Sequence, residues 1–135
     1  WLDFARGLGA QAPEVKAEVP FPETSVLVDN YFDLAQGDWK DGLCALFAYE
    51  SQVPAVSTSK IDGLERFYGV TDAPSLRVFQ VHQQYDVEHA RKVAELIDLH
   101  AEPVAAEAAT RKAADALWGF LDGMCREAGI PTHCP

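Results

Sequence analysis

The chain has 135 residues, of which 48% are hydrophobic, and this fits one domain with a core of its own. Its formal net charge is -10 and no cluster of Lys and Arg stands out, which argues against a nucleic-acid partner because phosphate binding needs a basic surface. No apolar stretch approaches the roughly 20 residues that a membrane span requires.

The first residues, WLDFARGLG, have the pattern of the last turns of a helix that stops at Gly9. A helix without its beginning suggests an upstream segment absent from this chain, and processing of a native N-terminus is the alternative. Residues 10–22 are rich in proline and are expected to form a loop. The next helix is expected to begin near Thr24 or Ser25, either of which can cap it, and to stop at Gly37.

The middle of the chain carries the signals of further helices. Asp38 can cap a helix through WKDGLCALFAYESQ, and Pro54 either bends that helix or begins a new one. The segment PAVSTSKIDGLERFYG closes at Gly69. Asp72 and Pro74 then form a cap and first-turn pair for a long helix through LRVFQVHQQYDVEHARKVAELIDLH.

A last helix is expected to open at Pro103 and to end at Gly129, followed by a loose tail, IPTHCP. No run alternates with period two for long enough to indicate a strand, and VSTSK at 56–60 is the nearest candidate. The pattern therefore predicts an all-α helical bundle that forms a single domain over residues 1–135.

The long helix carries a group of possible metal ligands. His82, Asp86 and His89 are spaced i, i+4, i+7 and fall on one narrow face of a helix. Two imidazoles and a carboxylate in an apolar stripe are unfavourable without a partner, which a divalent metal would supply. A hydrogen-bonded structural cluster is the alternative. The stripe that we expect to be buried with them contains Val78, Phe79, Val93 and Leu96.

Glu50 on the preceding predicted helix adds a fourth candidate ligand. It continues an apolar stripe made by Leu43, Leu46 and Phe47, and a buried carboxylate requires a cation or a proton. The alternative is a Glu at a helix end that reaches solvent. Carboxylate and imidazole ligands suit iron or manganese, whereas the absence of Cys removes the most distinctive sign of zinc.

Other reactive side chains lie near these residues in the sequence. Tyr49 adjoins Glu50, Lys60 follows one turn beyond Pro54, and Tyr85 lies at the edge of the histidine face. Each fits a radical or proton-transfer residue near an oxidising metal, and each fits packing or surface equally well. The cysteines, Cys44, Cys125 and Cys134, lack regular spacing and indicate reduced thiols, with Cys44 packed in the core.

The blocks ALFAYESQVPAVSTSKIDGLERFYG and FQVHQQYDVEHA resemble the CADD family, the Chlamydia protein associating with death domains and its bacterial relatives. That family lies in the heme-oxygenase-like group with TenA/THI-4 and PqqC proteins. The resemblance covers roughly residues 1–122. It implies a heme-oxygenase-like fold whose N-terminal helices are absent here, and two divalent metal ions, iron or iron with manganese. Glu50, His82, Asp86 and His89 match family ligands, and a further Glu and His would lie upstream of Trp1.

The resemblance also implies a function. CADD-like enzymes are oxygen-activating non-heme di-iron oxidases or oxygenases that make p-aminobenzoate for folate, consuming one of their own tyrosines while a lysine supplies nitrogen. Tyr49 and Lys60 match the catalytic Tyr and Lys of that branch. The implied partners are molecular oxygen, a reductant, a small-molecule or self-derived substrate and a second copy in a homodimer. The cytoplasmic location is expected from the cysteines, which indicate reduced thiols.

Three other functions are open on the same fold. A TenA-like thiaminase would use a cysteine nucleophile, for which Cys44 is the candidate, and no metal. A PqqC-like oxidase would also work without metal but would need basic residues for a polycarboxylate substrate, and this chain is acidic. A non-enzymatic binding protein would retain the acidic and imidazole cluster as a relic.

Overall fold

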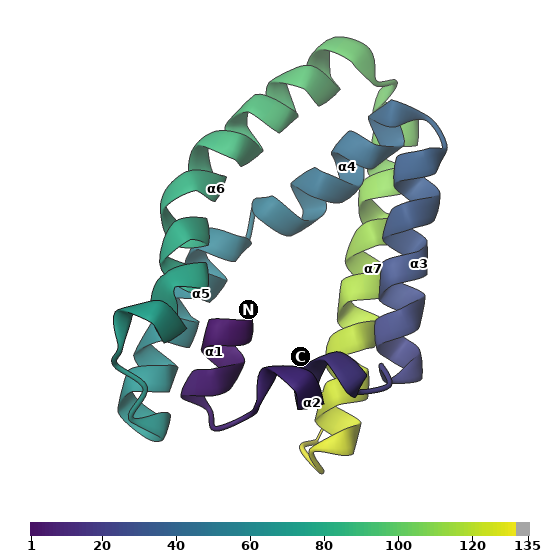
Figure 1. The fold of residues 1–135 in the computed structure, drawn as a ribbon. Coiled ribbons are helices and arrows are strands. Elements are labelled where there is room, and N and C mark those ends of the chain that lie inside the picture. Colours follow the sequence, from purple (N-terminus) through teal and green to yellow (C-terminus); the bar gives the residue numbers. More distant parts are fainter. Residues whose placement is uncertain (132–135) are drawn as a thin grey trace. The chain divides into compact units, whose positions relative to one another are not determined.

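The chain forms helices joined by turns in the computed structural model, which describes residues 1–131 (Figure 1). No strand occurs in that range, which confirms the predicted all-α class. None of the described helices has the length and apolar composition needed to cross a bilayer. In chain order the elements are α1 (Leu2–Gly7), α2 (Ala12–Ala17), α3 (Pro22–Gln36), α4 (Trp39–Glu50), α5 (Val53–Gly63), the π-helical turn η1 (Leu64–Tyr68), α6 (Ala73–His100) and α7 (Pro103–Glu127).

The loop predicted for residues 10–22 is wrong in part, because the short helix α2 lies within it. The backbone N–H of Gln11 donates to Oε2 of Glu14 at 3.0 Å and so satisfies a donor that a helix start leaves unpaired. Pro13 lies in the first turn, where a missing N–H is tolerated. Proline at this position therefore begins a helix instead of preventing one.

The start of α3 also differs from the prediction of a cap at Thr24 or Ser25. The helix begins at Pro22, with Phe21 as its N-cap residue in an extended conformation. The fixed φ of proline suits the first turn of a helix, so the helix starts earlier than the hydroxyl residues suggest. Its end at Gly37 agrees with the sequence.

The other boundary signals are confirmed. Asp38 accepts a hydrogen bond from a first-turn N–H of α4 at 3.1 Å. Pro54 lies in the first turn of α5, so it begins a new helix and does not bend the preceding one. Gly69 has φ +67°, a left-handed conformation that ends η1. Asp72 caps α6 by accepting from Ser75 twice, from the backbone N–H at 3.1 Å and from Oγ at 2.9 Å.

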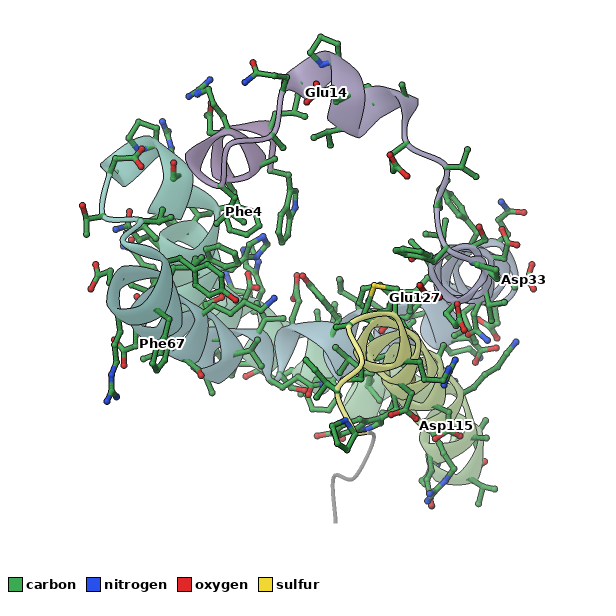
Figure 2. The ribbon with its side chains drawn as sticks, turned by 90° about the horizontal axis from the view of Figure 1, so that it is seen from below. Phe4, Glu14, Asp33, Phe67, Asp115 and Glu127 are labelled. Carbon is green, nitrogen blue, oxygen red and sulfur yellow. The ribbon has the colours of Figure 1, made fainter. Side chains whose placement is uncertain are left out.

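The chain divides into two compact units, and the first comprises Trp1–Val19 and Glu50–Arg91. The rings of Phe4 and Phe79 meet edge to face there, with centroids 5.1 Å apart. Figure 2 shows Phe4 turned from α1 toward the other helices of this unit. The buried core of the unit consists of Leu64, Val70, Leu76 and Phe79, against which Phe4, Ile61 and Val78 pack.

Helix α1 approaches α6 closely in this first unit. Oγ of Ser75 donates to the carbonyl oxygen of Asp3 at 3.3 Å. A Cβ atom added at Gly7 would lie 2.7 Å from Cβ of Ser75 and closer still to its Oγ. Only glycine therefore fits at position 7 without displacing Ser75.

The second unit comprises Pro20–Tyr49 and Lys92–Pro135, described to residue 131. Helices α3 and α7 run side by side in it (Figure 1). Nη2 of Arg126 and Oε1 of Glu23 form an ion pair between the two helices at 2.5 Å. The buried core consists of Leu34, Cys44, Ala45, Ala48, Ala109 and Ala113.

The buried face of α4 is not the one predicted from Leu43, Leu46 and Phe47. Leu46 is 41% exposed, and the buried residues of α4 are small. Alanine and cysteine side chains allow neighbouring helices to approach closely, which large side chains prevent. Packing therefore turns the face made by Cys44, Ala45 and Ala48 inward. The single-domain assignment for residues 1–135 stays a prediction.

Candidate metal centre

Asp86 lies at the centre of a polar cluster on α6, in the first unit. It is 4% exposed. Its two carboxylate oxygens face different histidines of the same helix, with Oδ2 2.8 Å from Nδ1 of His82 and Oδ1 3.8 Å from Nδ1 of His89. The spacing i−4 and i+3 places both imidazoles beside the carboxylate, as helical periodicity predicts.

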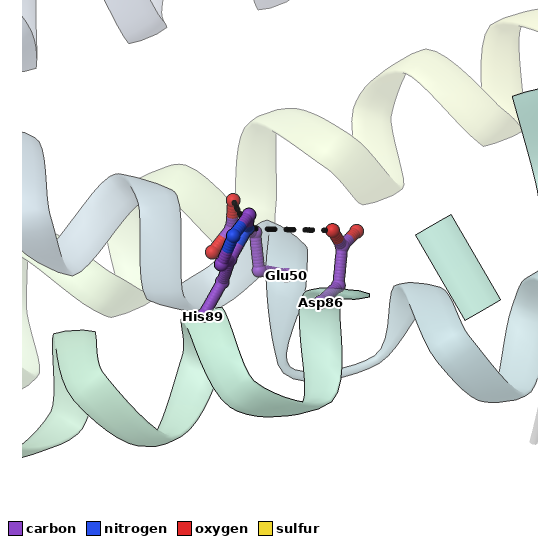
Figure 3. A group of neighbouring side chains, drawn as sticks. All are labelled: Glu50, Asp86 and His89. Carbon is purple, nitrogen blue, oxygen red and sulfur yellow. Dashed lines mark ion pairs between the residues drawn. The ribbon is translucent and has the colours of Figure 1, made fainter. Parts of the chain in front are cut away.

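Glu50, the last residue of α4, reaches the same cluster. Its Oε1 lies 3.7 Å from Nδ1 of His89 (Figure 3). Its Oε2 is buried and accepts no hydrogen bond from any described residue. A buried carboxylate oxygen without a donor is unfavourable, so this atom is open to a cation.

Glu50, Asp86 and His89 together could hold a metal ion. One ligand atom from each lies within 4.8 Å of the others. Because metal–ligand bonds are about 2 Å long, ligand atoms on one ion lie within about 4 Å of each other, so small side-chain rotations would close this set. Two carboxylates and an imidazole suit iron or manganese. The donors and the unpartnered oxygen therefore fit such an ion.

The electrostatics of the cluster also favour a cation. Burial raises the pKa of the Glu50 carboxyl above its usual range. The negative charge of Asp86 raises this pKa further, while His89 and His82 act in the opposite direction. A positive ion among these groups would relieve both the burial and the repulsion of the two carboxylates.

His82 stands beside this group of three and is not part of it. Its Nδ1 is hydrogen-bonded to Asp86, which leaves Nε2 as the nitrogen available to a metal. The side chain of His82 is 33% exposed and that of His89 is 54% exposed. The predicted burial of this face is therefore right for Asp86 but wrong for His89 and for Leu96, which is 43% exposed.

The two residues predicted as catalytic occupy different surroundings. Tyr49 is half-buried and immediately precedes Glu50 on α4. Lys60 on α5 is exposed, and its Nζ lies 5.7 Å from the centroid of the Phe79 ring, within the range of a cation–π contact. Tyr85, at the edge of the histidine face, is exposed.

The thiol of Cys44 lies in the core of the second unit. Cys44 is 0% exposed, as predicted for a core residue. Burial raises its pKa, the charge of Asp41 raises it further, and a hydrogen bond with Thr110 acts against them. A buried thiol with a raised pKa is a poor nucleophile, which argues against the thiaminase-like alternative. Cys134 and part of the predicted tail lie outside the described residues.

A cavity beside His82 was not predicted from the sequence. It has a volume of about 240 Å³ and is lined in part by Trp1, Phe4 and Arg77. These residues come from α1 and its N-cap and from the first turns of α6. The packing of α1 on α6 brings these residues together. Their spacing in the sequence therefore does not predict that they line one cavity.

Comparison with known proteins finds one matching family and several relatives. Residues 1–122 match the family described as iron-containing redox enzyme. A 4-aminobenzoate synthase of Nitrosomonas europaea is 41% identical over 129 residues, which are 92% of this chain and 52% of that protein. A 4-aminobenzoate synthase of Chlamydia muridarum is 31% identical over 137 residues, 99% of this chain and 58% of that protein. These findings confirm the resemblance inferred from the sequence motifs.

The chain spans little more than half the length of the relatives that it matches. A third 4-aminobenzoate synthase, from Chlamydia trachomatis, is 31% identical over 127 residues, and the match covers 55% of its length. The matched part includes Glu50 and the segment of α6 with both histidines, because it covers 92% of this chain. The relatives' names describe those longer proteins.

Proposed function

The chain belongs to the iron-containing redox enzyme family, and on that basis we propose that it contributes ligands to a non-heme iron centre of an oxygen-activating oxidase or oxygenase. The observation that carries the proposal is the convergence of Glu50, Asp86 and His89, with ligand atoms within 4.8 Å of one another. The unpartnered Oε2 of Glu50 supports it, because hydrogen-bonded structural clusters leave few buried oxygens unsatisfied.

We propose that four side chains of this chain bind the metal. Glu50, Asp86 and His89 supply one carboxylate oxygen or imidazole nitrogen each, and His82 supplies Nε2. Asp86 also accepts the hydrogen bond from Nδ1 of His82, which holds that imidazole in one tautomer. Iron bound there would supply the redox chemistry that activates oxygen. We further propose that the centre binds two metal ions. These are either both iron or one iron and one manganese.

The protein environment suits a site that small molecules can reach. The burial of Asp86 and most of Glu50 keeps the carboxylates away from competing water. The exposed imidazole of His89 leaves one side of the cluster accessible to oxygen and to a reductant. We therefore propose that oxygen and the reductant approach past His89.

The proposed product is 4-aminobenzoate. It rests on the names of the relatives and on the match of Tyr49 and Lys60 to catalytic residues of the CADD family. We propose that Tyr49 is an oxidisable phenol near the centre and that Lys60 supplies nitrogen. Assembly as a homodimer and a cytoplasmic location stay predictions.

Metal analysis of the purified protein tests the proposal. We expect iron in the wild type and oxygen consumption in the presence of a reductant. His89→Ala should lose both while its circular dichroism spectrum stays helical. His100→Ala is the matched control, because His100 lies on the same helix, against the Trp39 ring, and should keep both. Retention of iron and oxygen uptake by His89→Ala would contradict the site.

A further inference from the structure

The cavity beside His82 combines an apolar wall with a cationic group. Its volume of about 240 Å³ lies just below the range of about 300–1,000 Å³ that is usual for ligand pockets, so it suits a molecule with a single ring. His82 lines one part of it. The apolar wall is formed by Trp1, Phe4, Val78 and Val81.

The aromatic part of this wall is held by ring contacts. The Trp1 ring meets Phe4 edge to face with centroids 6.0 Å apart, and it meets Phe79 in the same way at 5.7 Å. Phe79 is buried in the core of the first unit. Trp1 itself is 64% exposed, so its ring rests on the buried ring of Phe79 and leaves a face against which a flat ring can pack.

Arg77 supplies the charge. Its side chain lines this cavity and also a neighbouring one of about 600 Å³. Asp3 lines both cavities too, but it pairs with Arg6, Oδ1 to Nη2 at 2.7 Å. Among residues 1–131 no carboxylate forms an ion pair with Arg77. Arg77 is exposed at the cavity wall, where its planar guanidinium can form two parallel hydrogen bonds to a carboxylate.

We propose that this cavity binds a small aromatic carboxylate, with its ring against the Trp1–Phe4 wall and its carboxylate on Arg77. The proposal rests on the proposed function, because the relatives' names make a substituted benzoate the relevant member of this class. A neutral aromatic molecule would leave Arg77 unpaired, and an inorganic anion would leave the apolar wall uncovered. His82 lines the same cavity, so the ligand would bind next to the proposed iron centre.

Calorimetric titration of the metal-free protein tests the site without relying on turnover. The probes are 4-aminobenzoate, the proposed product, and 4-hydroxybenzoate, in which a hydroxyl group replaces the amino group. 4-Aminobenzamide lacks the negative charge, and cyclohexanecarboxylate lacks the aromatic ring. We expect at least one of the two benzoates to bind. We expect 4-aminobenzamide and cyclohexanecarboxylate to bind more weakly than that benzoate. The ratio of the two benzoate affinities measures how strongly the site distinguishes an amino group from a hydroxyl group.

Substitution of Arg77 tests the role of the charge. Arg77→Met keeps most of the apolar stem and should weaken benzoate binding about tenfold or more, as expected for a lost charge-assisted contact. Arg77→Lys should restore part of the affinity. Arg66→Met is the matched control, because Arg66 lies over the Phe67 ring in the same unit and lines none of the cavities described above. Its affinity should equal that of the wild type.

Two outcomes would overturn the inference. One is that no benzoate binds to protein that takes up iron, which would remove the ligand site and leave the proposed iron centre standing. The other is equal affinity in Arg77→Met and the wild type. Benzoate binding that depends on Arg77 in protein that takes up no iron would instead support the cavity and contradict the proposed centre.

Discussion

Nδ1 of His82 lies 2.8 Å from Oδ2 of Asp86, one turn further along α6. This contact ties the orientation of an imidazole to a buried carboxylate and leaves Nε2 facing away from it. The other oxygen of the same carboxylate faces His89. Asp86 therefore links both histidines, and a change there should disturb both imidazoles at once.

Asp86→Asn should lower iron affinity by at least about 10–100-fold, the range seen when a group that orients a metal ligand is lost. Asparagine removes the negative charge and replaces one acceptor oxygen by a donor NH₂ group. Titration of iron against a competing chelator measures the effect. Asp98→Asn changes an exposed carboxylate of the same helix and should bind iron like the wild type. Equal affinities in the two variants would contradict the role of Asp86.

Part of this centre follows from sequence because it depends only on helix periodicity. His82, Asp86 and His89 share a face of α6 wherever the helix packs. The end of α4 brings Glu50 to them, although the apolar stripe from which its burial was predicted is not the buried face of that helix. Exposure of His89 could not be predicted in this way, because burial depends on which elements cover a helix face.

The packing details were less predictable. The sequence favoured Leu46 as a buried residue of α4, yet the small residues Cys44 and Ala48 are the buried ones. Hydrophobicity alone does not indicate which face a neighbouring helix can approach closely. The cavity beside His82 has the same origin, since it depends on Phe4 of α1 lying against Phe79 of α6.

Gly7→Ala should destabilise the protein by about 1–3 kcal/mol, the usual effect of an added methyl group in a packed site. The new Cβ would meet the side chain of Ser75, which holds α1 to α6. Gly119→Ala is the control, because a Cβ at that helical position meets no described atom within 4 Å apart from its chain neighbours and the backbone of its own helix. It should stabilise the protein by about 0.5–1 kcal/mol through helix propensity. Denaturant unfolding measures the change in unfolding free energy of each variant. Similar changes in Gly7→Ala and Gly119→Ala would refute the close approach at Gly7.

Cys44→Ala should leave iron binding and oxygen uptake intact, because its thiol is fully buried in the core of the second unit. The same burial predicts that Cys44 reacts with a thiol reagent much more slowly than Cys125, which is half-buried. Rates of labelling, assigned by peptide mass spectrometry, test this order. Loss of activity in Cys44→Ala with an unchanged melting temperature would favour the thiaminase-like alternative.

Tyr31→Phe should keep the stability of the protein at neutral pH within about 1 kcal/mol of the wild type, or raise it. Oη of Tyr31 is buried and bonds to no described residue, so its removal breaks no hydrogen bond within residues 1–131. Burial, with a smaller contribution from Tyr49, raises the pKa of Tyr31 from 10.0 to about 12. The folded protein thus holds this proton more tightly than the unfolded chain does.

The raised pKa of Tyr31 determines how the stability of the protein changes at alkaline pH. The contribution of Tyr31 to stability is complete below pH 10, the ordinary pKa of a tyrosine, and is lost as the pH rises toward about 12. Phenylalanine does not ionise, so Tyr31→Phe should lose less stability than the wild type over this range. Urea unfolding at a series of alkaline pH values measures the difference. Parallel stability curves for the two proteins would show that the Tyr31 hydroxyl ionises in the folded state as readily as in water.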